Sequence, residues 1–249
     1  MKVGKIKKLK NNKYKITIDD FDIVVYDDIL IKYNILYKKE IDTNLLKTIS
    51  EENLYYDNYN KALKYSLKKI RSKKEVYKYL EKLEMKKSDI DKIISKLENL
   101  NILNDINFVR AYINDKIILS KDSLNKIKDD LIKSGIKSSL IEEEIQKIEN
   151  NDKEKLEKLI LKRINSNHRF STYNLKNKVL NEFLNLGYEY DDIVEIYDNN
   201  KRDDYDILLK EYNKLKYKYK DKYSNYETII SSKLFSKGFK YSDIKPKDL

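Results

Sequence analysis

The sequence predicts a mainly α-helical protein: an elongated tandem array of three-helix repeats, preceded by a small antiparallel β element. First, the 249 residues include one proline and four glycines, too few for a loop-rich all-β fold. Second, Gly135, Gly187 and Gly238 are spaced 52 and 51 residues apart, and apolar residues recur around them in one register. Third, only about the first 26 residues alternate apolar and polar side chains as strands do.

Residues 1–57 are expected to form this β-rich element and the helices that link it to the array. Side chains alternate over residues 14–18 and a β-branched run follows at 23–25, which predicts two or three antiparallel strands. After these strands the apolar spacing becomes helical, and Asp28 and Asp42 are the expected N-caps.

The rest of the chain divides into four units, residues 58–102, 103–150, 151–200 and 201–249. Each unit should contain a first helix, a loop, a second helix, a glycine turn and a third helix. Corresponding positions are Val76, Ile127, Val179 and Ile230, then Leu80, Leu131, Phe183 and Leu234 in the second helix, and Ile90, Ile141, Ile193 and Ile244 in the third. The first unit has Glu84 where the others have glycine. The expected caps of the third helices are Ser88-Asp89, Ser138-Ser139, Asp191-Asp192 and Ser242-Asp243.

The composition leaves little room for catalysis. Without cysteine there is no disulfide, thiolate nucleophile or Cys-based zinc site, and His168 alone cannot build a His-rich metal site or a Ser/His/Asp triad. The glycines stand apart, so the chain has no glycine-rich phosphate loop. We therefore expect no enzymatic activity, no cofactor and no metal. The basic N-terminus leads into no long apolar run, which predicts a cytoplasmic protein without a membrane segment.

The net charge of +11 suggests a nucleic-acid partner, but the kind of basic residue weakens that interpretation. Only five of the 53 basic residues are arginine, the side chain that reads guanine edges, and the lysine excess resembles the codon bias of an AT-rich genome. Net charge is +7 over residues 60–100, −2 over 101–152, 0 over 153–200 and +5 over 201–249. We expect the second unit to face protein, and the first and fourth to lie nearer DNA or acidic protein.

The first two units carry the most distinctive motifs. Those of the first are Ala62-Leu63, Tyr65, Arg71-Ser72, Glu75 and Leu80. Those of the second are Leu103-Asn104-Asp105, Phe108, Ala111-Tyr112, Ser120-Lys121, Ile127, Leu131 and Gly135-Ile136. Together they resemble the RecX family of proteins that regulate bacterial RecA filaments, with Asp122 in place of the family's usual loop glycine. The N-terminal extension is similar to that of longer members from low-GC Gram-positive bacteria.

The resemblance implies a non-enzymatic modulator that lies along the groove of the RecA–DNA filament. We expect the chain to be a monomer. Members of the family suppress ATP hydrolysis, strand exchange and co-protease activity. Contact with single- or double-stranded DNA would be weak and independent of sequence. The candidate partner-binding residues are the basic side chains Arg71, Lys73, Lys74, Arg110, Lys121, Lys126, Lys128, Lys216 and Lys218.

Other interpretations stay open. Three-helix units with a glycine turn resemble helix-turn-helix modules, so a stand-alone DNA-binding protein is the main alternative. The Lys/Tyr-rich residues 212–226 interleave cations and aromatic rings as single-strand binders do, but a helix whose tyrosines pack on the third unit is the favoured alternative. Arg71 could cap carbonyls or pair with an acid, and Phe108 and Tyr112 lie on an apolar stripe that favours the core. A carboxylate nuclease could use Asp19, Asp20, Asp22, Asp27 and Asp28, but capping of turns is the more usual role of such residues.

Overall fold

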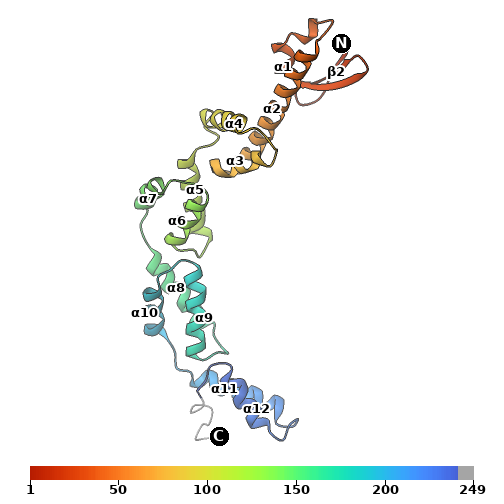
Figure 1. The fold of residues 1–249 in the computed structure, drawn as a ribbon. Coiled ribbons are helices and arrows are strands. Elements are labelled where there is room, and N and C mark those ends of the chain that lie inside the picture. Colours follow the sequence, from red (N-terminus) through yellow and green to blue (C-terminus); the bar gives the residue numbers. More distant parts are fainter. Residues whose placement is uncertain (241–249) are drawn as a thin grey trace. The chain divides into compact units, whose positions relative to one another are not determined.

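The computed structural model describes residues 1–240 and confirms a mainly helical chain behind a small antiparallel sheet (Figure 1). The expected cap Ser242-Asp243 and the repeat position Ile244 lie outside the described residues. The strands are β1 (Val3–Lys8), β2 (Lys13–Ile18) and β3 (Phe21–Tyr26). The first helices are α1 (Asp27–Lys32), the 3-10 helix η1 (Ile35–Tyr37), α2 (Thr43–Leu67), α3 (Lys73–Glu81) and α4 (Lys87–Asn99). The others are α5 (Asp105–Leu119), α6 (Leu124–Lys133), α7 (Ser138–Gln146), α8 (Asp152–Asn165), α9 (Thr172–Asn185), α10 (Tyr190–Asn200), α11 (Tyr205–Tyr219) and α12 (Tyr226–Phe235).

Internal packing divides the chain into two bodies. The N-terminal body comprises Met1–Ala111 together with Ser134–Ile136. The C-terminal body comprises Tyr112–Lys133 and the chain from Lys137 onward. Each body is described by itself below.

The predicted sheet is confirmed, with three strands in the order β1-β2-β3. β2 is the central strand and pairs antiparallel with both neighbours. Its inward-facing Ile16 and Ile18 are fully buried and pack with Ile29 of α1 and Ile49 of α2. The alternation seen in the sequence is thus one buried and one exposed face of a small sheet.

The expected caps are confirmed in part. The side chain of Asp42 caps α2, because its Oδ1 accepts a hydrogen bond from Leu45 N at 2.7 Å. Asp28 is not a cap: α1 starts after Tyr26, and Asp28 lies in its first turn.

The caps predicted for the third helices are wrong wherever the structure describes them. α4, α7 and α10 follow Lys86, Lys137 and Glu189, and no side chain caps them. The predicted residues Ser88-Asp89, Ser138-Ser139 and Asp191-Asp192 lie inside the first turns. There an acidic residue still interacts favourably with the positive end of the helix, but it does not cap it.

Capping serines occur one helix earlier. Ser72 and Glu75 form a reciprocal capping box at the start of α3. Ser123 accepts a hydrogen bond from Lys126 N at 3.2 Å, and Ser171 accepts one from Asn174 N at 3.3 Å, at the starts of α6 and α9. All three serines are buried, so each start of a second helix lies under other parts of the chain.

The start of α6 is covered by the turn after α9 and by the first residue of α8. Gly187 follows α9 with φ +83°, and a Cβ there would lie 2.6 Å from Ser123 Oγ. The preceding Leu186 carbonyl accepts a hydrogen bond from Ser123 N at 2.9 Å. Asp152, the first residue of α8, accepts one from Leu124 N at 2.7 Å. We call this set of capping serine, aspartate and glycine turn a joint.

The same joint recurs at two other helix starts. At α9 its members are Ser171, Asp204 and Gly238, with Asp204 accepting from Thr172 N at 2.7 Å and Lys237 O accepting from Ser171 N at 3.1 Å. At α3 they are Ser72, Asp105 and Gly135, with Asp105 paired to Lys73 at 3.8 Å and Gly135 packed on the Lys74 side chain. Because close approach and a positive φ coincide, glycine is required at these turns.

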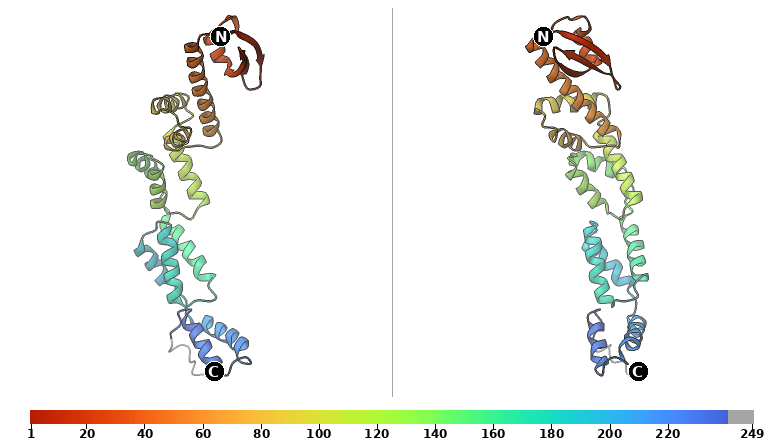
Figure 2. Two further views of the ribbon diagram at one scale, coloured as in Figure 1. Left: turned by 45° about the vertical axis from the view of Figure 1, so that its right-hand side comes forward. Right: turned by 90° about the vertical axis from the view of Figure 1, so that its right-hand side faces the viewer.

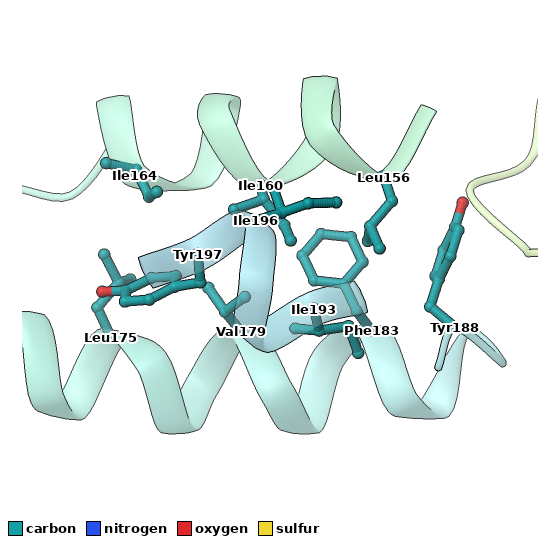
Figure 3. Packing of buried hydrophobic residues seen from close by; sticks show 10 residues of the cluster. All are labelled: Leu156, Ile160, Ile164, Leu175, Val179, Phe183, Tyr188, Ile193, Ile196 and Tyr197. Atoms are coloured by element: carbon teal, nitrogen blue, oxygen red, sulfur yellow. The ribbon is translucent and has the colours of Figure 1, made fainter. Parts of the chain in front are cut away.

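The core of the C-terminal body is clearest in α8, α9 and α10, which pack side by side (Figure 2). Figure 3 shows Leu156 and Ile160 of α8 facing Val179 and Phe183 of α9, with Ile193 of α10 beside Phe183. Every described member of the repeat register is buried: Val76, Leu80, Ile90, Ile127, Leu131, Ile141, Val179, Phe183, Ile193, Ile230 and Leu234. The same helical spacing therefore supplies buried residues in each of the two bodies.

α2 is one continuous helix of 25 residues. It runs from the sheet to the start of α3, and the expected boundary between residues 57 and 58 lies in its middle. The N-terminal element and the first helix of the first expected unit therefore share one helix.

Candidate partner-binding surface

Arg71 is built into the N-terminal body. Its Nε donates to the carbonyl of Tyr65 at 2.9 Å, and its guanidinium lies 3.5 Å from the centroid of the Tyr65 ring. Tyr65 in turn stacks on Tyr79, with ring centroids 4.2 Å apart. The Arg71 side chain is only 12% exposed. These contacts favour the structural alternative for this residue.

Lys73 and Lys74 belong to the joint at α3. The ammonium of Lys73 is paired with Glu98, and this hydrogen bond raises the pKa of Lys73. Lys74 is exposed, but its stem packs against Gly135 and it makes a further contact. Both lysines thus help to hold helices together.

The basic residues predicted on α5, on α6 and in the loop between them are also engaged. Lys128 is paired with Glu142 at 2.9 Å, and Lys126 lies 3.8 Å from Asp130. Lys121 is the most open of the three lysines, with 61% of its side chain exposed and Glu182 at 3.9 Å. Arg110 is exposed and has an internal partner. Intramolecular pairing therefore offsets much of the charge predicted for this surface.

Asp122, at the position of the family's usual loop glycine, fixes the loop before α6 with an ion pair. Its Oδ2 lies 2.6 Å from Lys116 Nζ. Burial alone would raise the pKa of Asp122, but the hydrogen bond from Lys116 lowers it. Lys155 Nζ donates to the Asp122 carbonyl at 2.9 Å, and Tyr188 donates to the Lys121 carbonyl at 3.0 Å. The loop is thus held from both sides.

Lys216 and Lys218 differ from the other predicted residues. Neither forms an ion pair with a carboxylate within residues 1–240. Lys216 Nζ lies 5.7 Å from the ring centroid of Tyr212, and Lys218 Nζ lies 5.5 Å from that of Tyr219. Their charge is therefore available for an outside partner.

Sequence reasoning did not single out three neighbours of these lysines on α11, although Lys214 and Tyr217 lie inside the flagged stretch 212–226. Tyr217 is 92% exposed, and Lys210 and Lys214 are exposed on the same side of the helix. The signal was present, since positions 210, 214, 217 and 218 have the spacing of one helical face.

An apolar surface at the end of α5 was missed as well. Ile118 and Leu119 are 77% and 81% exposed. Beside them, Ile117 lines a hollow of about 250 Å³ whose wall includes Leu124 and Ile127. Exposed aliphatic side chains next to an apolar hollow are typical of protein-binding surfaces.

Phe108 and Tyr112 lie where the apolar stripe predicted. Phe108 is buried, and Tyr112 is half-buried with its hydroxyl 3.3 Å from Asp130. Neither ring is presented for stacking on a base.

The aspartates of the nuclease alternative do not converge on a metal site. Asp22 is engaged by Lys15 at 2.6 Å and by Thr17 at 2.7 Å, while Asp19 accepts a hydrogen bond from Lys2 N at 2.7 Å. Within residues 1–240 no three Asp, Glu or His side chains lie close enough to share a metal ion. None of the helices in this range has the length and apolar character needed to cross a bilayer.

Comparison with models of known protein families gave no match. Among solved structures, the crystal structure of RecX from Lactobacillus salivarius superposes with a TM-score of 0.51. It is 30% identical in sequence, and the match covers 97% of that chain and 59% of this one. The chain belongs to the RecX family. The resemblance predicted from the motifs of the first two units is thereby confirmed.

Other RecX proteins extend the match to almost the whole chain. Regulatory protein RecX of Lactococcus lactis is 29% identical and that of Listeria welshimeri 26%, each match covering 98% of this chain and 95% of the relative. A second crystal structure of a regulatory protein RecX, 20% identical, has the same fold, with a TM-score of 0.62 over 79% of this chain. The predicted similarity to RecX of low-GC Gram-positive bacteria is confirmed, and these relatives are named as regulators.

Proposed function

We propose that this chain regulates the RecA nucleoprotein filament and inhibits its ATPase, strand-exchange and co-protease activities. The observation that carries the proposal is the alignment of 98% of the chain with proteins named regulatory protein RecX. Such a regulator acts as a monomer in the cytoplasm, by binding, and performs no reaction of its own.

The four-unit division at residues 58–102, 103–150, 151–200 and 201–249 is part of this proposal. The recurring joint supports it, because Ser123 and Ser171 each contact the glycine turn that comes three helices later, and the equivalent turn at Gly135 packs on Lys74, two residues after Ser72. An array of this kind presents the same face several times, which suits a partner made of identical subunits.

We assign the protein-facing surface to the end of α5. Ile118 and Leu119 are exposed there beside an apolar hollow, and the 101–152 segment has a net charge of −2. Burying two large aliphatic side chains supplies binding energy that an acidic segment cannot obtain from DNA phosphates. Among the predicted basic residues, Lys121 lies nearest in sequence to this surface and keeps most of its side chain exposed.

Inhibition then follows from differential binding. A ligand that binds one filament state more tightly than another shifts the population toward that state. If the array binds best to neighbouring subunits in an arrangement that does not hydrolyse ATP, cycling slows without any chemistry by the regulator.

Co-sedimentation with RecA filaments on single-stranded DNA tests this proposal. The wild-type chain should pellet with filaments, and the Ile118→Ser/Leu119→Ser double variant should bind at least about tenfold more weakly, as for a moderate binding hot spot. Leu54→Ser is the matched control, since Leu54 is 61% exposed on α2. Wild-type protein that pellets no more with filaments than with bare DNA would overturn the proposal.

A further inference from the structure

We propose that the exposed face of α11 binds single-stranded nucleic acid directly: Tyr217 stacks on a base, and Lys210, Lys214 and Lys218 contact the flanking phosphates. This contact does not require RecA, so it goes beyond the proposed regulation of the filament and can fail or hold independently of it.

The tyrosines of the Lys/Tyr-rich stretch have separate roles. Tyr212, Tyr219 and Tyr226, seven residues apart, pack against the buried core formed by Leu215, Ile230 and Leu234 among others. Tyr217 is 92% exposed and makes no hydrogen bond or ring contact within residues 1–240. Tyr223 is 50% exposed, but its ring centroid lies 6.0 Å from that of Tyr219. The core and this ring contact therefore account for the other tyrosines but not for Tyr217.

The lysines around Tyr217 are unpaired. Lys210, Lys214 and Lys218 are exposed and form no ion pair with a carboxylate in the described chain. Together with Tyr217 they occupy positions i, i+4, i+7 and i+8, so they form one stripe about 12 Å long on the helix. The nearest acidic residues of this face, Asp206 and Asp221, lie toward its two ends and are not paired with it.

The buried side of α11 explains why this stripe stays exposed. Leu208 and Leu215 pack inward, and Glu211 beside them is neutralised by Lys237. The helix is thus anchored on one side and needs nothing from Tyr217 for its packing. Replacement of Tyr217 should leave the fold intact, which makes the stripe directly testable.

The side chains of this stripe favour single-stranded nucleic acid over a duplex or an acidic protein. Lysines without acidic partners attract phosphates, and release of counterions makes such binding depend on salt. A rigid, exposed ring offers a stacking platform that any unpaired base can use. A DNA duplex hides the faces of its bases, so Tyr217 could not stack on them. An acidic protein would contact the lysines but would not need the Tyr217 ring. The experiment below distinguishes these two ligands from a single strand.

The test measures the anisotropy of a fluorescent oligo-dT with the full chain and no RecA. Tyr217→Ala should weaken binding about 5- to 150-fold, the range found when one stacked base is lost, whereas Tyr217→Phe should bind as the wild type does. The Lys210→Gln/Lys214→Gln/Lys218→Gln variant should flatten the slope of log affinity against log salt by up to about 2, at about 0.7 per phosphate contact. An abasic strand of equal length should bind the wild type and Tyr217→Ala equally.

The controls are Tyr205→Ala, which removes a 52% exposed ring from another face of α11, and Lys158→Gln, which removes an exposed lysine paired with Glu154. Neither should change the affinity. The proposal is overturned if Tyr217→Ala binds oligo-dT as tightly as the wild type, if duplex DNA binds more tightly than the single strand, or if a polyglutamate of equal charge competes as well as oligo-dT does. None of these results would bear on co-sedimentation with RecA filaments.

Discussion

Glu84 holds a left-handed backbone conformation, φ +55°, at the position that Gly135, Gly187 and Gly238 hold in the later turns. The other non-glycine residues with positive φ in the described chain are asparagine or aspartate, whose short polar side chains tolerate it. Glutamate has no such compensation, so Glu84 carries strain that the shape of the turn imposes. The spacing of 51 residues between Glu84 and Gly135 predicted that the two positions are equivalent.

Glu84→Gly should therefore stabilise the protein. Removing left-handed strain gains about 1–2 kcal/mol, of which the greater freedom of glycine in the unfolded chain takes back about 0.5–1 kcal/mol. Urea unfolding should show a higher midpoint. Lys82→Gly is the control two residues earlier, where φ is −65°, and it should lower the midpoint. A lower midpoint for both variants would mean that Glu84 is not strained.

The helix caps show how far individual capping residues can be predicted from the sequence. The Ser72-x-x-Glu75 pattern is a capping-box signature, and it was available to sequence reasoning. The exposed serines at 88 and 138 looked equally suitable, because nothing in the sequence says which serine will be buried under a glycine turn. Burial at a joint depends on residues that lie far away in the chain.

At the scale of elements, Asp57 ties the sheet to α2. It is paired with Lys13 of β2 at 2.9 Å and with Lys61 at 2.8 Å, and it accepts a hydrogen bond from the hydroxyl of Tyr26 at 2.9 Å. The hydrogen bond from Lys61, with those from Lys13 and Tyr26, holds the pKa of Asp57 well below its usual range. The sequence predicted the strands and the helix, but not this contact across 44 residues.

The lowered pKa of Asp57 determines how the stability of the fold changes with pH. Asp57 stabilises the fold fully above its unfolded-state pKa of about 3.9 and loses this contribution as the pH falls toward the folded-state value. Asp57→Asn should cost about 1–3 kcal/mol at pH 7, as expected for charge-assisted hydrogen bonds, and the difference from the wild type should shrink below about pH 4. Thermal unfolding from pH 7 to pH 2 measures it.

The control for Asp57 is Asp20→Asn, which removes a carboxylate from an exposed turn. Its unfolding temperature should follow that of the wild type at every pH. An Asp57→Asn difference that stays constant down to pH 2 would show that the carboxylate charge does not stabilise the link between the sheet and α2.

At the scale of the whole molecule, the joints are contacts between separate helices, which helical periodicity cannot predict. Periodicity predicted the helices, their buried faces and the glycine turns from Val76, Ile127 and their equivalents, because these depend on local spacing. It did not predict that Gly187 covers Ser123, or that Asp152 accepts a hydrogen bond from the start of α6, because these contacts join separate helices. Periodicity also did not predict which lysines lack an ion pair in the part of the chain that the structure describes, such as Lys216 and Lys218 of α11, since ion pairing depends on which helices lie next to each other.

Gly187→Ala tests the joint at α6. The new methyl group would lie 2.6 Å from Ser123 Oγ and 2.8 Å from Lys126 Cβ, at φ +83°. Left-handed strain and overpacking together should cost about 2–4 kcal/mol. Urea unfolding measures the loss, and hydrogen exchange should rise at the start of α6 as well as in the substituted turn.

Gly4→Ala is the comparison for Gly187→Ala. Gly4 lies in β1 without a positive φ, and its closest contact would be 3.3 Å from the Thr17 carbonyl, so the change should be within about 1 kcal/mol. Equal losses for both variants, or faster exchange confined to the turn, would mean that the joint does not couple the helices.

The most direct test of the proposed regulation is the ATPase activity of RecA from the same organism, stimulated by single-stranded DNA, with the chain titrated below stoichiometry. Because each array would bridge several filament subunits, the rate should fall by more than the fraction of RecA molecules bound one to one. The chain alone should hydrolyse no ATP. A RecA rate that stays unchanged when the chain is in excess over RecA would contradict the account.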